Sequence, residues 1–167
     1  PFDLFKGEVG FVTGSFGMNR LTADVNVPLS DATAIRVNTA YQSQNTFQDA
    51  GNRSSFFIAP SFKFQASERL TFLIKTEFLE SNSVNAPMIF LNRNATLKFD
   101  RIDPFLSNYE RSFTGNELSI RNPSYGIQAQ ALYRLSPNWT SQTVISRSST
   151  KTDGYYHYLF DAGDGDS

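Results

Sequence analysis

Arginine, aromatic and amide side chains are gathered between positions 81 and 123. Guanidinium groups donate hydrogen bonds to anions, and aromatic rings stack on cations and flat groups. A segment of about forty residues is also too long to be a passive connection between elements of regular structure. The side chains of interest are Phe90, Asn92, Arg93, Arg101, Tyr109, Arg111 and Arg121. They either bind a ligand or pack the segment against the rest of the fold.

Other site chemistry has little support in the composition. The chain has no cysteine and one histidine, His157, so thiolate and His-rich metal sites are excluded. The acidic residues at 161–166 do not have the spacing of an EF-hand loop, and we expect a solvated loop there. No arrangement of a nucleophile with a general base is evident. We therefore expect no catalytic residue, no metal, no cofactor and no enzymatic activity.

The charge balance and the hydropathy pattern exclude further classes. The 15 Lys and Arg residues are matched by 16 Asp and Glu residues, and no basic block is present, so nucleic acid is not an expected partner. The longest apolar stretch, at 70–74, is far shorter than the roughly 20 residues of a membrane-spanning helix. We expect no such helix.

The dominant pattern has a period of two, which places every second side chain on the same face of a strand. Between 21 and 27 the odd positions are Leu, Ala or Val, and the even positions are Thr, Asp or Asn. The run after a turn at 28–33 repeats this alternation. The predicted pairs of this hairpin are Val27 with Ile35, Leu21 with Tyr41, and Asn26 with Arg36. Each pair joins residues of the same polarity.

Two further hairpins are predicted, with turns at 67–69 and 136–138. The predicted pairs are Phe64 with Leu70, Phe62 with Phe72, Pro60 with Ile74, Ile58 with Thr76, Phe56 with Phe78, Leu135 with Trp139, and Ala131 with Thr143. A strand at 8–15, turning at 16–19, precedes all three hairpins, and part of an eighth strand is expected at 155–160. The prediction is an antiparallel, up-and-down, all-β chain of about seven strands.

Strand length and loop asymmetry favour a membrane barrel. The predicted strands are roughly 9–13 residues long, whereas strands of soluble domains are commonly about 5–6 and bilayer-crossing strands about 9–11. Short turns lie at one end, and the long connections 45–54 and 81–123 lie at the other, as in outer-membrane barrels. The tight turn at 16–19, on the side of the long connections, is the exception. Aromatic residues near the ends of the apolar face, among them Phe64 and Trp139, suit the headgroup level. A soluble β-sandwich, which also alternates, is the alternative.

The alternation assigns side chains to the two faces of the predicted barrel wall. The expected lipid-facing residues are Leu21, Val25, Ile35, Val37, Tyr41, Phe56, Ile58, Phe62, Phe72, Ile74 and Phe78.

The opposite face should line the interior of the barrel. The expected lumen-facing residues are Asp24, Asn26, Arg36, Asn38, Gln128, Gln130 and Arg134. An open sheet would leave an edge of unpaired backbone groups in lipid, so we expect residues 1–167 to form one partial barrel segment, completed by strands outside this sequence.

An ordered set of motifs resembles the first barrel strands of TonB-dependent siderophore receptors. The motifs are Thr13-Gly14-Ser15-Phe16, Ala23-Asp24-Val25-Asn26-Val27-Pro28-Leu29, the strand bearing Arg36, Phe57-Ile58-Ala59-Pro60-Ser61-Phe62, and residues 70–80. Thr13 replaces the tyrosine, and Val27 the glycine, of the usual family pattern.

The resemblance implies a large outer-membrane barrel, closed by a plug domain and energised through TonB, that binds a ferric siderophore or similar chelate with its outward loops. The side chains at 81–123 named above would then contact the chelate or pack on the rim or plug, and the lumen-facing residues would contact the plug. A passive porin-like channel and a soluble all-β ligand-binding module are the alternatives.

Overall fold

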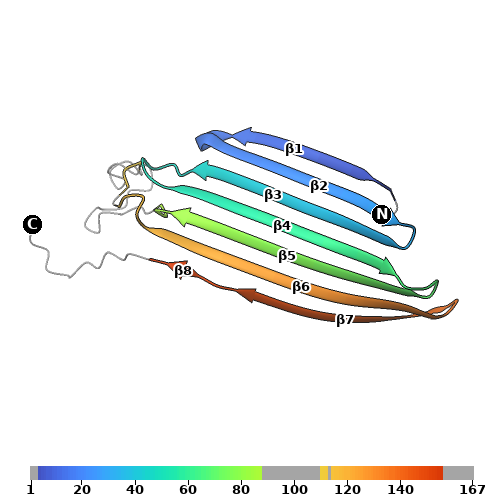
Figure 1. The fold of residues 1–167 in the computed structure, drawn as a ribbon. Coiled ribbons are helices and arrows are strands. Elements are labelled where there is room, and N and C mark those ends of the chain that lie inside the picture. Colours follow the sequence, from blue (N-terminus) through green and yellow to red (C-terminus); the bar gives the residue numbers. More distant parts are fainter. Residues whose placement is uncertain (1–3, 88–109, 113, 156–167) are drawn as a thin grey trace, which may run out of the picture.

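The computed structural model describes residues 4–87, 110–112 and 114–155. The described chain forms one antiparallel sheet and one short 3-10 turn, η1 (Ser15–Gly17). Consecutive strands pair from β1 to β7, which confirms the predicted up-and-down order (Figure 1). The strands are β1 (Lys6–Gly14), β2 (Met18–Ser30), β3 (Thr33–Asn45), β4 (Asn52–Gln65), β5 (Leu70–Val84), β6 (Ser119–Ser136), β7 (Trp139–Thr150) and β8 (Asp153–Gly154). β8 pairs with β6.

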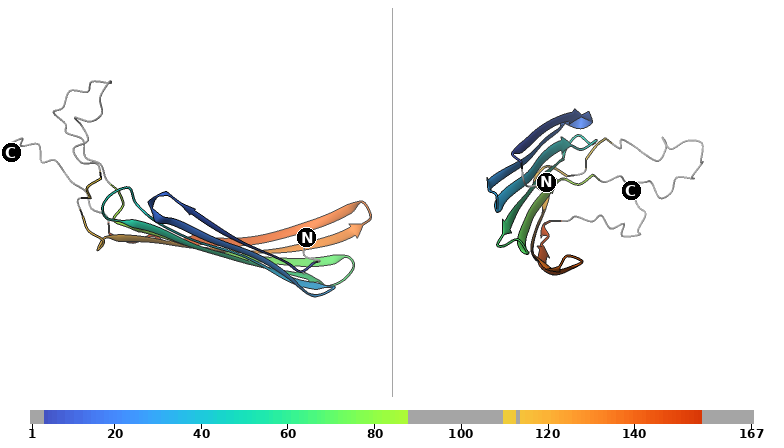
Figure 2. Two further views of the ribbon diagram at one scale, coloured as in Figure 1. Left: turned by 90° about the horizontal axis from the view of Figure 1, so that it is seen from above. Right: turned by 90° about the vertical axis from the view of Figure 1, so that its right-hand side faces the viewer.

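The sheet is a single curved layer (Figure 2). Among the described residues only Ala34 and Ile120 are buried hydrophobic residues. Large apolar side chains in the middle of the sheet stay exposed, including Phe62 at 36% and Ile74 at 41%. No second layer of described chain covers them. A soluble sandwich would bury such groups between two sheets, so the described residues do not form one.

The register divides the side chains into two faces, because directly paired residues lie on the same side of a sheet. The pairs Val27 with Ile35, Leu21 with Tyr41, and Asn26 with Arg36 all occur, so the predicted register between β2 and β3 is confirmed. One row of paired residues crosses the sheet through Val27, Ile35, Phe62, Ile74, Ala129 and Ile145. We call the side of this row the apolar face and the opposite side the polar face.

The predicted register between β4 and β5 is wrong by two residues. Phe64 pairs with Phe72, rather than with Leu70, and Phe62 pairs with Ile74. The turn is centred one residue later in the chain than the predicted pairs require, and the Ser67 hydroxyl accepts the backbone N–H of Leu70 there at 3.1 Å. A shift of two residues keeps each side chain on its face, so the apolar pattern is equally compatible with both registers.

The third hairpin follows the predicted register except at its turn. Ala131 pairs with Thr143 as predicted. Trp139 pairs with Ser136 rather than with Leu135, because the register shifts between Arg134 and Ser136. Such an irregularity beside a tight turn lets two residues of one strand oppose one residue of the other.

Two prolines interrupt the ladder without changing its register. Pro60 lies inside β4, and the pairing between β4 and β5 lapses there while Ile58 and Ser61 remain in one register with Phe78 and Lys75. Pro123 lies inside β6 and keeps its partner Glu80 on β5, but the pairing on its other side is interrupted. Its carbonyl accepts the N–H of Lys151 at 2.9 Å, but it has no N–H to return, and the strand opposite it is divided there into β7 and β8.

Short turns and long connections lie at opposite ends of the sheet, as predicted, except for the short turn between β1 and β2, which lies at the end of the long connections. The turns after β2, β4 and β6 leave two, four and two residues outside strands, as the strand bounds show. At the other end, residues 46–51 join β3 to β4, and residues 85–118 join β5 to β6. Both long connections are shorter than predicted, because β4, β5 and β6 continue past their apolar sections. The predicted strand at 155–160 falls almost wholly outside the described residues.

We predict that Gly51→Ala destabilises the loop between β3 and β4. Gly51 has a φ of 107°, and an added Cβ would lie 2.6 Å from the Asn85 carbonyl oxygen and 2.9 Å from that of Val84. Strain of this kind costs about 1–3 kcal/mol. The measurement is the urea midpoint of unfolding in detergent for the intact protein that contains this chain.

Gly7→Ala is the matched control, because nothing lies within 4 Å of a Cβ added there. Equal urea midpoints for the two variants would contradict the prediction, because they would show that the Val84 and Asn85 carbonyl groups leave room for a Cβ at position 51.

Candidate functional site

The polar face carries a cluster of charged and amide side chains on β2 and β3. Arg36 donates from Nε and Nη2 to the two carboxylate oxygens of Asp24, at 2.9 and 2.6 Å. Asn38 lies directly opposite Asp24, and with its amide turned to match its neighbours it donates to both oxygens, at 3.0 and 3.2 Å. Asn26 donates to the Leu4 carbonyl at 2.6 Å. Lys6, Glu8, Asp24, Asn26 and Arg36 line a hollow on this face.

All seven residues predicted to face the lumen lie on the polar face, but the structure does not bring them together. Gln128, Gln130 and Arg134 lie on β6, away from the cluster on β2 and β3. Arg134 has a structural contact instead: its Nη2 donates to the Glu68 carbonyl at 2.6 Å, which fastens β6 to the turn between β4 and β5. This contact gives Arg134 a structural role within the sheet that requires no partner in the barrel interior.

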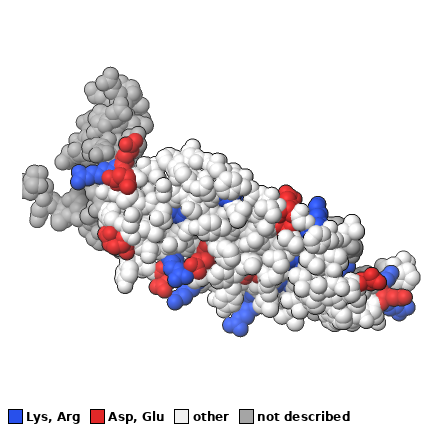
Figure 3. Space-filling view, turned by 45° about the horizontal axis from the view of Figure 1, so that its top comes forward, with Lys and Arg blue, Asp and Glu red and all other residues white. Residues whose placement is uncertain are grey.

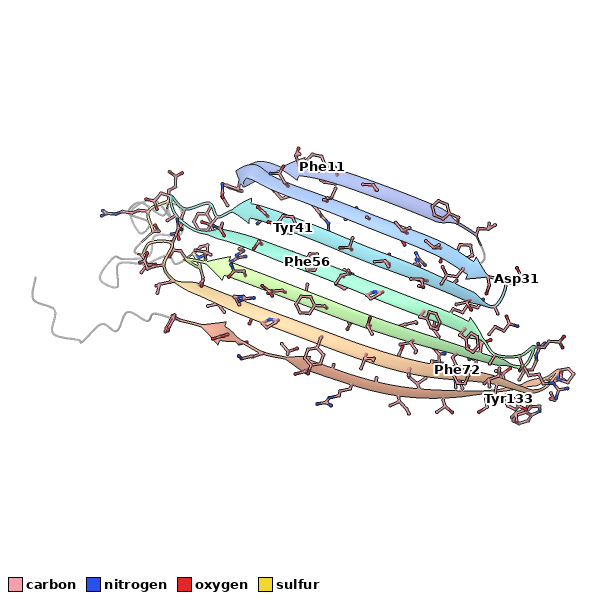
Figure 4. All side chains as sticks on the ribbon, in the orientation of Figure 1. Phe11, Asp31, Tyr41, Phe56, Phe72 and Tyr133 are labelled. Carbon is pink, nitrogen blue, oxygen red and sulfur yellow. The ribbon has the colours of Figure 1, made fainter. Side chains whose placement is uncertain are left out.

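The residues predicted to face lipid all lie on the apolar face. The register places five of them on β2 and β3 and six on β4 and β5. Phe56 and Phe78 are near neighbours, with ring centroids 6.4 Å apart and planes inclined at 53°. Figure 4 shows Phe11, Tyr41 and Phe56 in adjacent positions across the sheet, and Phe72 and Tyr133 nearer the short turns.

The predicted ligand-binding residues are only partly described. Phe90, Asn92, Arg93, Arg101 and Tyr109 lie outside the described residues. Arg111 lies in the long connection and is exposed, and its carbonyl accepts the Gln48 Nε2 at 3.2 Å. The placement of Arg121 in a loop is wrong. It lies inside β6 on the apolar face, and it donates to Glu80 Oε1 from Nη2 at 2.8 Å and from Nε at 3.2 Å.

The loop between β3 and β4 is fastened to the long connection by polar contacts. Asp49 Oδ1 accepts the Ser112 hydroxyl at 2.6 Å and the Ser112 N–H at 2.7 Å. The Asp49 N–H donates to the Glu110 carbonyl at 2.7 Å, and the Gly51 N–H donates to Asn116 Oδ1 at 3.0 Å. Two connections that are distant in sequence thus form one rim at this end of the sheet.

A small hollow opens on this rim. Its volume is about 250 Å³, and it is lined by Phe16, Gln44, Asn45, Thr46, Phe47, Arg53 and Pro87. Phe16 is 58% exposed and has a φ of 58°, a conformation that costs a non-glycine residue about 1–2 kcal/mol. Strained backbone of this kind concentrates at functional sites. The hollow combines the aromatic rings of Phe16 and Phe47 with the guanidinium group of Arg53.

Sequence analysis missed Phe16, Phe47 and Arg53 as members of one site. They come from the β1–β2 turn, the β3–β4 loop and the start of β4, and only the pairing of β1 to β4 brings these segments together. The available signal was weak: two Phe residues and one Arg close to the turns at the long-loop end. Among the described residues no group of three or more His, Cys, Asp or Glu could hold a metal ion. His157 and the acidic residues at 161–166 lie outside that part of the chain.

Comparison with known proteins gives structural matches without sequence matches. No family model and no curated protein matches the sequence. The ferripyoverdine receptor of the outer membrane of Pseudomonas aeruginosa, bound to ferripyoverdine, matches with a TM-score of 0.74 at 16% identity, over 90% of this chain and 20% of that chain. The ferric-catecholate import receptor Fiu of Escherichia coli K12 matches with a TM-score of 0.73 at 15% identity, over 91% and 22%.

The chain has the fold of a segment of these receptors. A third match, the FpvAI receptor in complex with pyocin S2, has a TM-score of 0.70 at 17% identity over 86% of this chain. The chain spans about a fifth of the length of these proteins. No helix in the described part of the chain is long and apolar enough to cross a membrane.

We predict that the contact between Asp49 and Ser112 weakens in acid. The hydrogen bonds from the Ser112 hydroxyl and N–H hold the pKa of the Asp49 carboxyl below its usual range. The folded-state pKa is therefore lower than the unfolded one, so this contribution is complete above the ordinary carboxyl pKa and is lost as pH falls through the depressed value. Hydrogen exchange at the Ser112 amide should accelerate, after correction for intrinsic rates, as pH falls from 7 to about 3.

Asp49→Asn should exchange faster than the parent at pH 7 and show little further change in acid. A parent protein whose corrected protection is the same across this range would contradict the assignment of Asp49.

Proposed function

We propose that this chain is part of the wall of an outer-membrane β-barrel, and that the complete protein takes up a ferric siderophore or similar chelate through TonB. The observation that carries the membrane placement is the segregation of charge across the sheet. Every charged residue of β1, β2, β3 and β4 lies on the polar face. Figure 3 shows a largely uncharged area in the upper middle of the visible surface, with charged groups at both ends and along the lower edge.

Aromatic residues frame the uncharged part of the apolar face. A loop-side belt consists of Phe11, Tyr41, Phe56, Phe78 and Tyr125, and a turn-side belt consists of Phe64, Phe72, Tyr133 and Trp139. Phe56 and Phe64 are eight residues apart, as are Tyr125 and Tyr133. At about 3.3 Å per residue and a tilt of about 40°, that separation spans roughly 20 Å of membrane, close to the height of an outer-membrane apolar band.

The belts also shift as expected for tilted strands. Phe78 pairs with Ile58 rather than with Phe56, so the loop-side belt is displaced by one row towards the turns between β4 and β5. Tyr133 pairs with Leu70 rather than with Phe72, so the turn-side belt is displaced in the same direction between β5 and β6. Strands of a closed barrel tilt from its axis, and a membrane plane then crosses them at shifted residues.

Uptake of a ferric chelate is supported by the fold and by the rim. The structural matches are a ferripyoverdine receptor and a ferric-catecholate import receptor. The hollow with Phe16, Phe47 and Arg53 offers aromatic faces and a cationic donor, which suit a flat anionic chelate. The polar cluster around Asp24 and Arg36 would contact the plug domain, and further strands would pair with the open edges of β1 and β7.

We predict that a lysine on the apolar face prevents assembly, whereas a lysine on the polar face is tolerated. Val25→Lys and Phe62→Lys should reduce the amount of folded protein in the outer membrane strongly, because a charge in the apolar band costs about 2–4 kcal/mol at the bilayer midplane. Asn38→Lys is the control on the polar face. The measurement is heat-modifiable migration of the protein from isolated outer membranes, and equal losses at the two faces would contradict the membrane placement.

We also predict that uptake depends on TonB and on Arg53. A bacterium whose only ferric-chelate receptor is the complete protein should accumulate radioactive iron from ferric catecholates or hydroxamates, and deletion of its TonB should abolish accumulation. Arg53→Gln should weaken chelate binding about tenfold or more, since a charge-assisted hydrogen bond contributes about 1.5–3 kcal/mol.

Arg69→Gln, at a short turn, is the matched control and should bind as the parent does. Uptake that persists without TonB would indicate a passive channel instead.

A further inference from the structure

The apolar face carries charge in one place only among the described strands. Its charged residues are Glu80, Arg121, Arg147 and Asp153, together with Lys151 between β7 and β8. All five lie in β5, β6 and the β7–β8 line, on the half of these strands that leads to the long connection. We call this set the rim charge cluster. The ten other charged residues of the described strands lie on the polar face.

The rim charge cluster extends from one row inward of the loop-side belt to two rows beyond it. Tyr125 of that belt pairs with Ser149, and Arg147 is two residues inward of Ser149. The next row outward from Tyr125 joins Glu80 to Pro123, whose carbonyl accepts the Lys151 N–H. The row after that joins Arg121 to Asp153. If the belt marks the headgroup level, Lys151 and Arg121 lie among the lipid headgroups, and Arg147 lies at their inner edge, where a long arginine side chain extends its guanidinium group outward.

The cations of the cluster exceed its anions. Arg121 is paired with Glu80, and Lys151 lies 3.7 Å from Asp153 with both side chains more than 70% exposed. Arg147 is exposed and has no ion pair or side-chain hydrogen bond within the described part of the chain. A guanidinium group beside Ile127 and the belt is costly in an apolar setting unless an anion accompanies it.

We propose that Arg147 and Lys151, with Arg121 beside them, bind the phosphate groups of a lipid headgroup in the leaflet on the long-loop side. The geometry supplies both parts of such a ligand: the cations bind the phosphates, while Phe78 and Tyr125, one row inward of Lys151 and two rows inward of Arg121, and Ile127, level with Arg147, contact the acyl chains. A guanidinium fork matches phosphate oxygens in two hydrogen bonds, and lysine adds a point charge. The proposal rests on the membrane placement proposed above, but not on the transported ligand.

The test measures lipid binding by the complete protein in a phosphate-free detergent. The probes are diphosphoryl lipid A, monophosphoryl lipid A, which differs from it by one phosphate, and inorganic phosphate. The parent should bind the diphosphoryl lipid most tightly and inorganic phosphate only weakly. The double variant Arg147→Gln/Lys151→Gln should lose roughly tenfold or more in affinity for the diphosphoryl lipid and lose its preference between the two lipids.

The control variant Lys75→Gln/Arg69→Gln removes two cations from the polar face and from a short turn. It should bind both lipids as the parent does. Equal binding by the two double variants, no preference of the parent for the second phosphate, or binding of inorganic phosphate as tight as that of the lipid would each overturn the proposal.

The experiment distinguishes failure of the lipid site from failure of the proposed membrane placement. Heat-modifiable migration and uptake of the ferric chelate should be unchanged in Arg147→Gln/Lys151→Gln, because neither residue lies at the Arg53 hollow. A parent protein that inserts and transports but shows no phosphate preference overturns the lipid site alone. A parent protein that remains folded and dispersed in plain buffer overturns the barrel and the lipid site together.

Discussion

The structure depends on one constraint, the antiparallel ladder of backbone hydrogen bonds that joins seven strands in sequence order. Because side chains alternate across a strand, a register between two neighbours decides which face each residue of both strands occupies. The register is consistent from β1 to β7, so one assignment at Val27 fixes the side of residues as distant as Ile145. The apolar face, the polar face and the rim all follow from this ladder.

The same ladder separates two kinds of electrostatic environment. On the polar face Arg36 neutralises Asp24, Asn38 donates hydrogen bonds to the same carboxylate, and the side chains of Asp24 and Arg36 line a hollow. On the apolar face charge is absent from β1 to β4 and is confined elsewhere to the rim charge cluster. Charges are expensive in hydrocarbon and inexpensive in water or against opposite charge, so this distribution is that of a membrane wall with a wet or protein-filled interior.

Sequence patterns predicted the faces better than the pairs. The three predicted pairs of β2 and β3 are all correct, because a clean alternation and a short turn leave few registers open, but the turn leaves only two residues outside the strands rather than the predicted 28–33. The hairpin of β4 and β5 was predicted two residues out of register, since the contacts of Ser67 rather than the apolar pattern decide the turn. The strands β4, β5 and β6 were predicted to be too short at the end that leads to the long connections. Beyond the aromatic belts both faces of a strand are polar, so the alternation fades although the backbone continues to pair, and Arg121 was taken for a loop residue for that reason.

The sequence by itself determined the secondary structure, the two faces and the end at which the long connections lie, because these depend on periodicity and on local turn residues. Only the tertiary structure decided which residues share a site. Phe16, Phe47 and Arg53 meet because β1 to β4 pair side by side, and Asp49 reaches Ser112 because two connections fold onto one rim. Arg121, Arg147 and Lys151 likewise converge only through the pairing of β6 with β7 and β8. These residues are close because of the register between strands that are distant in sequence. A local sequence pattern does not record that register.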